Sequence, residues 1–187
     1  MSHTQPGLPT HYTRTAILLH WLMALMIIAM FGLGLYMTGL KLSPQKLQLY
    51  SWHKWAGVSV FVLAAFRLVW RLTHTPPPHP AGMPRWQQIA ANGTHHLLYL
   101  LMIAIPLSGW LMSSAKGFQT VWFGVLPLPD LLAKDKALGD LLQGVHQALN
   151  LGLATLVLAH IAAAIKHHLV ERDGVLARML PFLQDKR

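Results

Sequence analysis

Long apolar runs, separated by polar and proline-containing segments, dominate this sequence of 187 residues. Four runs with few charged side chains stand out, at residues 15–39, 50–72, 95–115 and 143–169. A helix needs about 17–25 apolar residues to cross a bilayer, so the pattern predicts four membrane-spanning helices. The chain is long enough for one domain of ordinary size. We therefore expect an all-α fold, a transmembrane four-helix bundle formed by residues 1–187 as a single domain.

The second run is the weakest of the four, because Lys54 and Arg67 leave only twelve uncharged residues between them. Taken alone, this stretch could be a buried helix of a soluble protein. Lysine and arginine near the ends of a span can extend their charged groups to the interface, so the neighbouring runs favour a span here too. Between the third and fourth runs, "LLAKDKALGDLL" within residues 116–142 predicts an amphipathic helix at the membrane surface.

Composition supports a membrane protein and narrows its chemistry. Charged residues make up 11% of the chain, against about 25% in an average soluble domain. There is no cysteine, which excludes disulfides, thiolate-held iron–sulfur clusters and covalent attachment of haem. The twelve histidines are therefore the chief candidates for metal chemistry. The formal charge of +9 does not indicate nucleic acid, because the basic residues flank the apolar runs.

The distribution of lysine and arginine predicts the orientation. Nine of them lie on the side that carries both termini, and six lie on the opposite side. Cytoplasmic segments carry the excess of positive charge, so we expect both termini in the cytoplasm.

Two histidines bracket an uncharged segment of the fourth run, "HQALNLGLATLVLAH", residues 146–160. Fourteen residues are close to four helical turns, so His146 and His160 share one face and lie about 21 Å apart along the axis. They are too far apart to bind one metal ion together. Each therefore needs a partner at its own depth on another helix.

Depth in the membrane identifies these partners. His20 lies early in the first run and His160 late in the fourth, both near the cytoplasmic end. His53 and His146 lie near the outer end. Two imidazoles on opposing helices are typical axial ligands of a non-covalent haem b, so we predict an inner haem iron on His20 and His160 and an outer one on His53 and His146. A single membrane histidine is as readily a hydrogen-bonded packing residue, but four at two matched depths favour two haem groups.

Three further residues fit this arrangement. Gly57 and Gly152 leave space where a flat macrocycle could lie against the backbone. Arg67 is fourteen residues after His53, which predicts that it lies on the same face at the depth of the inner haem and pairs with a propionate.

A second set of histidines lies near the cytoplasmic end: His95, His96, His167 and His168. Imidazole can hydrogen-bond a quinone carbonyl and transfer a proton to it, so His95 and His167 are candidate quinone-binding residues. The alternative is a basic cluster that contacts lipid head groups.

The order and spacing of these motifs resemble the bacterial cytochrome b561 family across nearly the whole chain. The motifs are "HW" in the first run, "WHKWAGVSVFVLAAFRLVWRL" in the second, "HHLLYLLMIAIPLSGW" in the third and H-x13-H-x6-HH in the fourth. The resemblance implies a protein of the bacterial inner membrane with two haem b groups that passes electrons between the periplasmic side and ubiquinone. Its ligand positions fall on His20, His53, His146 and His160. The eukaryotic ascorbate-dependent proteins, with six helices, have a different histidine pattern.

The resemblance leaves the electron donor open. One bacterial member of the family oxidises superoxide and reduces ubiquinone, which makes a superoxide oxidase the favoured hypothesis. Lys54, beside His53, would then steer the superoxide anion, unless it is only a lysine at the end of a span. A related alternative is a cytochrome b subunit that receives electrons from a dehydrogenase or hydrogenase partner. A histidine-based metal or proton transporter is a third class, which predicts no haem.

Overall fold

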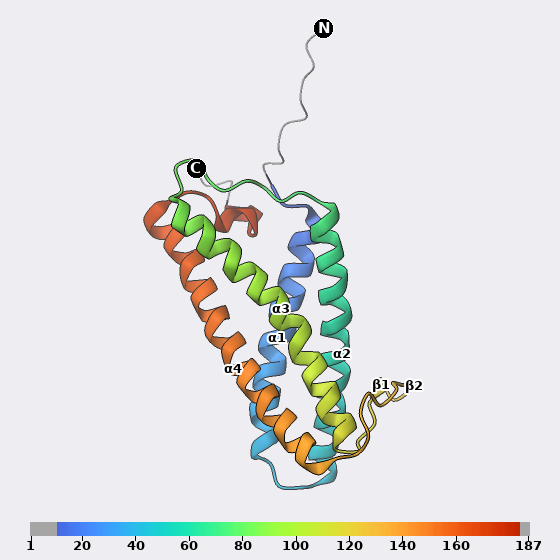
Figure 1. Cartoon of the computed structure of the whole chain (residues 1–187). Helices are drawn as coiled ribbons and strands as arrows, with labels where there is room; N and C mark the ends of the chain where they lie inside the picture. The colour runs from blue at the N-terminus through green and yellow to red at the C-terminus, as the bar shows by residue number, and fades with distance from the viewer. Residues whose placement is uncertain (1–10, 184–187) are drawn as a thin grey trace.

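Four long helices form the protein, as the hydrophobic pattern predicts (Figure 1). The computed structural model describes residues 11–183. The helices are α1 (Arg14–Gly39), α2 (Pro44–Thr73), α3 (Arg85–Ala115) and α4 (Lys136–Lys166). Each is long and apolar enough to cross a membrane. The fold is thus an all-α transmembrane bundle.

The last three helices begin earlier than their apolar runs, because polar residues extend them. A side chain caps α2 and α4, whereas α3 begins after Pro84 without a side-chain cap. Predicted starts at 50, 95 and 143 are replaced by Pro44, Arg85 and Lys136. The Ser43 hydroxyl accepts a hydrogen bond from the Lys46 amide at 3.2 Å, and the Asp135 carboxylate accepts one from the Leu138 amide at 3.0 Å. Hydropathy locates the part of a helix that lies in lipid, whereas the cap decides where the helix begins.

The amphipathic helix expected within residues 116–142 is wrong. Two short strands, β1 (Val121–Trp122) and β2 (Leu126–Pro127), pair antiparallel there as a hairpin. Its turn contains Phe123 and Gly124, with φ values of 51° and 72°. Only the final residues, from Lys136, are helical, and they form the first turns of α4. The helix begins only at Lys136, where the Asp135 side chain caps it.

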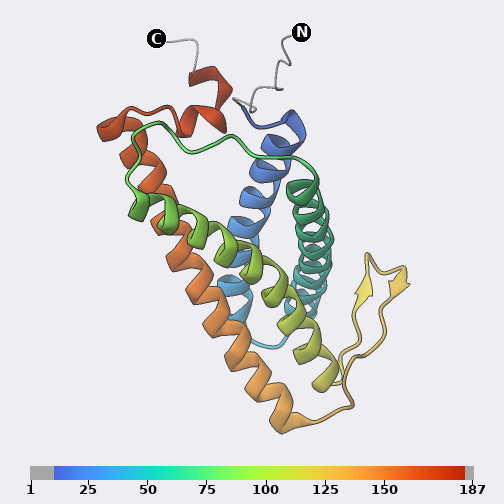
Figure 2. The ribbon, with the colours of Figure 1, turned by 45° about the horizontal axis from the view of Figure 1, so that its top comes forward.

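Neighbouring helices pack along their length, α1 against α2, α2 against α3 and α3 against α4. Figures 1 and 2 show the hairpin beside α2, toward the end of the bundle opposite the beginning of α1 and the end of α4. Two clusters of buried side chains form the core: Met23, Val60 and Ala64, and Leu101, Ile105 and Leu153. Many other large apolar side chains are exposed, as expected for a bundle whose solvent is lipid.

Beyond α4 the chain continues as a five-residue π-helical turn, η1 (His167–Glu171). Two short 3₁₀ turns follow, η2 (Leu176–Arg178) and η3 (Pro181–Leu183). The indole of Trp21 in α1 donates a hydrogen bond to the Met179 carbonyl at 2.8 Å. This contact holds the C-terminal segment against the N-terminal end of α1.

Candidate functional site

Two pairs of histidine rings face each other inside the bundle. His20 of α1 lies opposite His160 of α4, with ring centroids 6.2 Å apart and planes inclined at 62°. His53 of α2 lies opposite His146 of α4, at 6.4 Å and 78°. The structure thus brings together the residues that the depth argument paired. Because α4 supplies one ring to each pair, the length of helix between its two histidines sets their separation.

The spacing within each pair suits a single iron ion. An imidazole nitrogen lies about 2 Å from a bound transition metal and roughly 1 Å from its own ring centroid, so rings on opposite sides of one ion have centroids roughly 6 Å apart. Both pairs meet this value. His95 also approaches His160, but at 5.5 Å their centroids are closer than this arrangement requires. His20 is therefore the better partner for His160.

Hydrogen bonds fix the orientation of the His146 ring. Its Nδ1 lies 3.1 Å from the Ile105 carbonyl oxygen and 2.9 Å from the Ser108 hydroxyl. A carbonyl can only accept, so Nδ1 carries the proton and Nε2 keeps its lone pair for a metal. Across from it, His53 Nδ1 is buried and has no hydrogen-bond partner within residues 11–183. The pair therefore offers imidazole nitrogens of the type that would hold a haem iron, and one of its buried nitrogens has no other partner within the described residues.

Two glycines lie directly against the rings of this pair. A Cβ on Gly34 would be 3.5 Å from His53 Cε1, and a Cβ on Gly109 would be 3.2 Å from His146 Cε1. Gly57 and Gly152, the glycines that the sequence indicated, do not lie against a histidine ring.

The fourteen-residue spacing that indicated the histidine pairs could also have indicated the glycines that lie against the rings. Gly34 is fourteen residues after His20, and Gly109 is fourteen residues after His95. Both therefore lie on the face of their helix that carries the histidine.

Arg67 lies at the inner pair, as its spacing from His53 predicts. Its Nη2 lies 3.1 Å from His20 Nδ1, and its Nε donates to the Tyr99 hydroxyl at 3.2 Å. A guanidinium only donates, so His20 Nδ1 accepts here and the proton of the neutral ring is on Nε2. For His20 to bind a metal through Nε2, its proton must lie on Nδ1 instead, and Nδ1 can then no longer accept from Arg67. The guanidinium would be released from this ring and free to pair with an anionic group. Tyr99 was not identified from the sequence, although it follows His95 by four residues on the same helical face.

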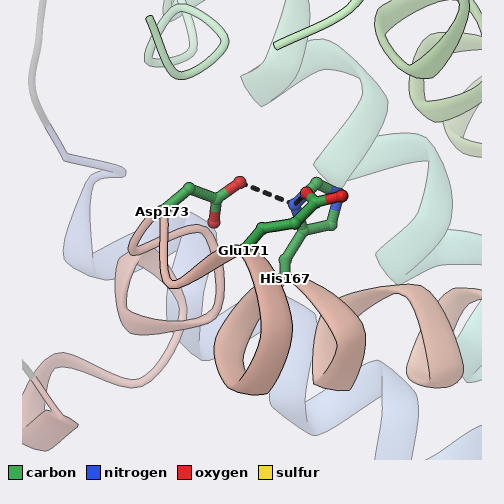
Figure 3. Close-up of side chains that lie close together, drawn as sticks. All are labelled: His167, Glu171 and Asp173. Atoms are coloured by element: carbon green, nitrogen blue, oxygen red, sulfur yellow. Dashed lines mark hydrogen bonds and ion pairs between the residues drawn. The ribbon is translucent and has the colours of Figure 1, made fainter. Parts of the chain in front are cut away.

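His167 lies beyond the inner pair, in a cluster with two carboxylates (Figure 3). Its Nδ1 is 2.6 Å from Glu171 Oε2 and 2.6 Å from Asp173 Oδ2. Both partners were missed in the sequence, where only the i,i+4 spacing of His167 and Glu171 indicates contact. Because carboxylates accept, Nδ1 carries a proton in this cluster.

Lys54 lies next to His53, and its side chain is hydrogen-bonded to the segment between α3 and β1. Its Nζ donates to the Phe118 carbonyl at 2.9 Å and lies 6.0 Å from the centroid of the Phe118 ring. The side chain is half-buried. Its positive charge is thus held in a defined place at the end of the bundle that contains His53 and His146.

Comparison with known proteins points to the same family as the sequence motifs do. The family described as prokaryotic cytochrome b561 matches residues 11–182. Cytochrome b561 homolog 2 of Escherichia coli (strain K12) is 34% identical over 180 residues, with 92% of each chain covered. Cytochrome b561 homolog 1 of the same organism is 31% identical over 175 residues, covering 91% of this chain and 97% of the relative. The probable superoxide oxidase CybB of Yersinia pestis is 29% identical over 171 residues, covering 91% and 96% respectively.

Proposed function

Since the chain belongs to the prokaryotic cytochrome b561 family, we propose that it carries electrons from superoxide to ubiquinone with two haem b groups. Membership makes it a bacterial multi-pass membrane electron carrier that binds b-type haem. The observation that supports two groups is the presence of two histidine pairs with centroid distances of 6.2 Å and 6.4 Å.

In this proposal His20 and His160 hold the inner haem, and His53 and His146 hold the outer one. The haem groups supply one-electron redox chemistry at two depths in the membrane. The helices fix the distance between the two positions at about 21 Å along α4. Ser108 and the Ile105 carbonyl keep the His146 ring in the ligating tautomer. Arg67, which contacts His20 Nδ1 in this structure, would pair with a haem propionate.

Superoxide is the proposed donor because of its charge and the name of one relative. Two superoxide anions each lose one electron and become dioxygen, while one ubiquinone gains those two electrons and two protons and becomes ubiquinol. Lys54 provides positive charge beside His53, which raises the encounter rate of a small anion at that end. A relative of 29% identity carries the name probable superoxide oxidase.

Ubiquinone is the proposed acceptor at the opposite end, where the chain offers proton donors. His95 lies 5.5 Å from His160, measured between ring centroids. His167 holds a proton between Glu171 and Asp173. We propose that these imidazoles hydrogen-bond the quinone carbonyls and pass protons to them. This end faces the cytoplasm, which supplies the protons.

The test is to mix purified haem-loaded protein with superoxide and a short-chain ubiquinone analogue under anaerobic stopped flow. We expect haem absorbance to show reduction faster than spontaneous dismutation removes superoxide, and ubiquinol to form in the ratio of one per two superoxide ions. No reduction by superoxide, together with co-purification of a dehydrogenase, would instead support a cytochrome b subunit of a larger complex.

Lys54→Gln tests the steering role separately. We expect the second-order rate of reduction by superoxide to fall roughly two- to five-fold, since one of the charges that attract the anion is lost. The difference from wild type shrinks at high salt, where the attraction is screened. Lys41→Gln, which removes an exposed charge on the α1–α2 connection, is the matched control and retains the wild-type rate. Equal effects of the two variants would contradict a special role for Lys54.

A further inference from the structure

The α3–α4 connection contains a long uncharged segment. No charged residue occurs from 117 to 129. Its apolar side chains are nevertheless largely exposed, with 59% of Phe123, 83% of Val125 and 51% of Leu126 accessible. A contiguous exposed apolar surface of this kind marks contact with another apolar phase.

Hydrogen bonds to α2 set the depth of this segment. The Trp55 indole donates to the Val121 carbonyl at 2.6 Å, and the Trp122 indole donates to the Ser59 hydroxyl at 3.3 Å. Ser59 is five residues beyond Lys54, about 7.5 Å further along α2 into its uncharged stretch. Figure 2 shows the hairpin running alongside α2 instead of across the end of the bundle. The hairpin tip therefore lies at the level of a membrane-spanning stretch.

Backbone amides of the hairpin are hydrogen-bonded within the hairpin itself, as a medium with little water requires. Within the turn, the Gly124 and Val125 amides donate to the Val121 and Trp122 carbonyls, and the Leu128 amide donates to the Thr120 carbonyl at 2.8 Å. Pro127 has no amide hydrogen to satisfy.

The segment that leads back from the hairpin is satisfied in the same way. The Leu128 carbonyl accepts from the side-chain Nε2 of Gln119 at 3.2 Å, and the Pro129 carbonyl accepts from the Trp110 indole at 3.1 Å. Pro129, like Pro127, has no amide hydrogen. Such pairing is required where lipid replaces water around a backbone.

We propose that the hairpin tip, residues 122–126, inserts into the acyl-chain boundary of the leaflet at the His53–His146 end. Lipid is the occupant because the tip continues the surface of α2, whose Trp52 and Val62 are 48% and 50% exposed at the depths that bracket it. The two indoles that hold the hairpin, Trp55 and Trp122, have the amphipathic character favoured at this boundary. The connection therefore anchors the bundle in the bilayer and is withdrawn from aqueous partners.

The absence of cysteine in the chain permits a direct test by site-directed spin labelling. Val125→Cys and, as a second site, Leu126→Cys carry a nitroxide in haem-loaded protein reconstituted into phosphatidylethanolamine–phosphatidylglycerol vesicles. Collision with lipid-soluble dioxygen and with a water-soluble nickel chelate is measured by power saturation. Leu151→Cys on α4, 67% exposed, is the lipid control, and Asp130→Cys, just past the uncharged segment, is the aqueous control. The haem spectrum verifies folding of every variant.

We expect the ratio of dioxygen to nickel accessibility at 125 and 126 to match that at 151 and to exceed that at 130 several-fold. Nickel accessibility equal to that at 130 would overturn the proposal, because the tip would then lie in water. Protection from both reagents would also overturn it, because the tip would then be covered by a second copy or another protein.

Discussion

The haem content of the purified protein is expected to fall by half when His160 is replaced by alanine. His160 is the α4 ring of the inner pair, 6.2 Å from His20 between centroids, and a b-type haem without covalent attachment depends on its axial ligands for binding. His146→Ala removes the outer group in the same way and leaves the inner one, and the double variant binds neither. Haem is measured as the pyridine haemochrome and chain concentration by amino-acid analysis.

His96→Ala is the control for these variants. His96 is an exposed imidazole on α3, beside His95 but outside both pairs, so its loss leaves the haem content unchanged. A redox titration identifies which group remains in each single variant. Retention of full haem content by His160→Ala would contradict the assignment, as would equal loss in His96→Ala.

Gly109→Val is expected to abolish binding of the outer haem and leave the inner one in place. A Cβ at this position already lies 3.2 Å from His146 Cε1 and 3.4 Å from its Nδ1. The two methyl groups of valine add volume at the same point. A packed interior accommodates such additions only by displacing neighbours, so the ring leaves its bonds to Ser108 and the Ile105 carbonyl. The haem content of the variant is measured as above.

The same helix provides a matched control. Gly93 also lies in α3, and a Cβ there would meet nothing within 4 Å, so Gly93→Val changes helix propensity without crowding a ring. Gly34→Val, beside His53, and Gly32→Val, with open space around it, repeat the comparison on α1. Equal haem content in Gly109→Val and Gly93→Val would show that contact with the His146 ring is unimportant.

Hydropathy was sufficient to predict the bundle, because a bilayer requires long apolar helices and little else has that pattern. It failed in the α3–α4 connection, where "AKDKALGDLL" has helical periodicity. The structure uses most of these residues to begin α4 at the Asp135 cap. The hairpin before them depends on hydrogen bonds between residues far apart in the sequence. These join Trp55 to the Val121 carbonyl and Trp122 to the Ser59 hydroxyl. Local sequence patterns contain no information about such contacts.

For the site, spacing along one helix predicted which depth each histidine occupies, and depth was enough to pair them. It could not show that the Ile105 carbonyl fixes the His146 tautomer, because that bond joins two helices. Nor could it show that Glu171 and Asp173 hold His167, since their approach depends on the π-helical turn after α4 and on Arg172, whose φ is 54°. Contacts within a helix are periodic in sequence, whereas contacts between helices depend on their rotation and packing.

The ratio of haem b to chain in the wild-type protein tests the central claim most directly. The pyridine haemochrome spectrum of the dithionite-reduced protein quantifies haem and identifies its type, and amino-acid analysis quantifies the chain. Two facing histidine pairs predict two equivalents of haem b per chain. One equivalent, or none, would contradict the assignment of both pairs as axial ligands.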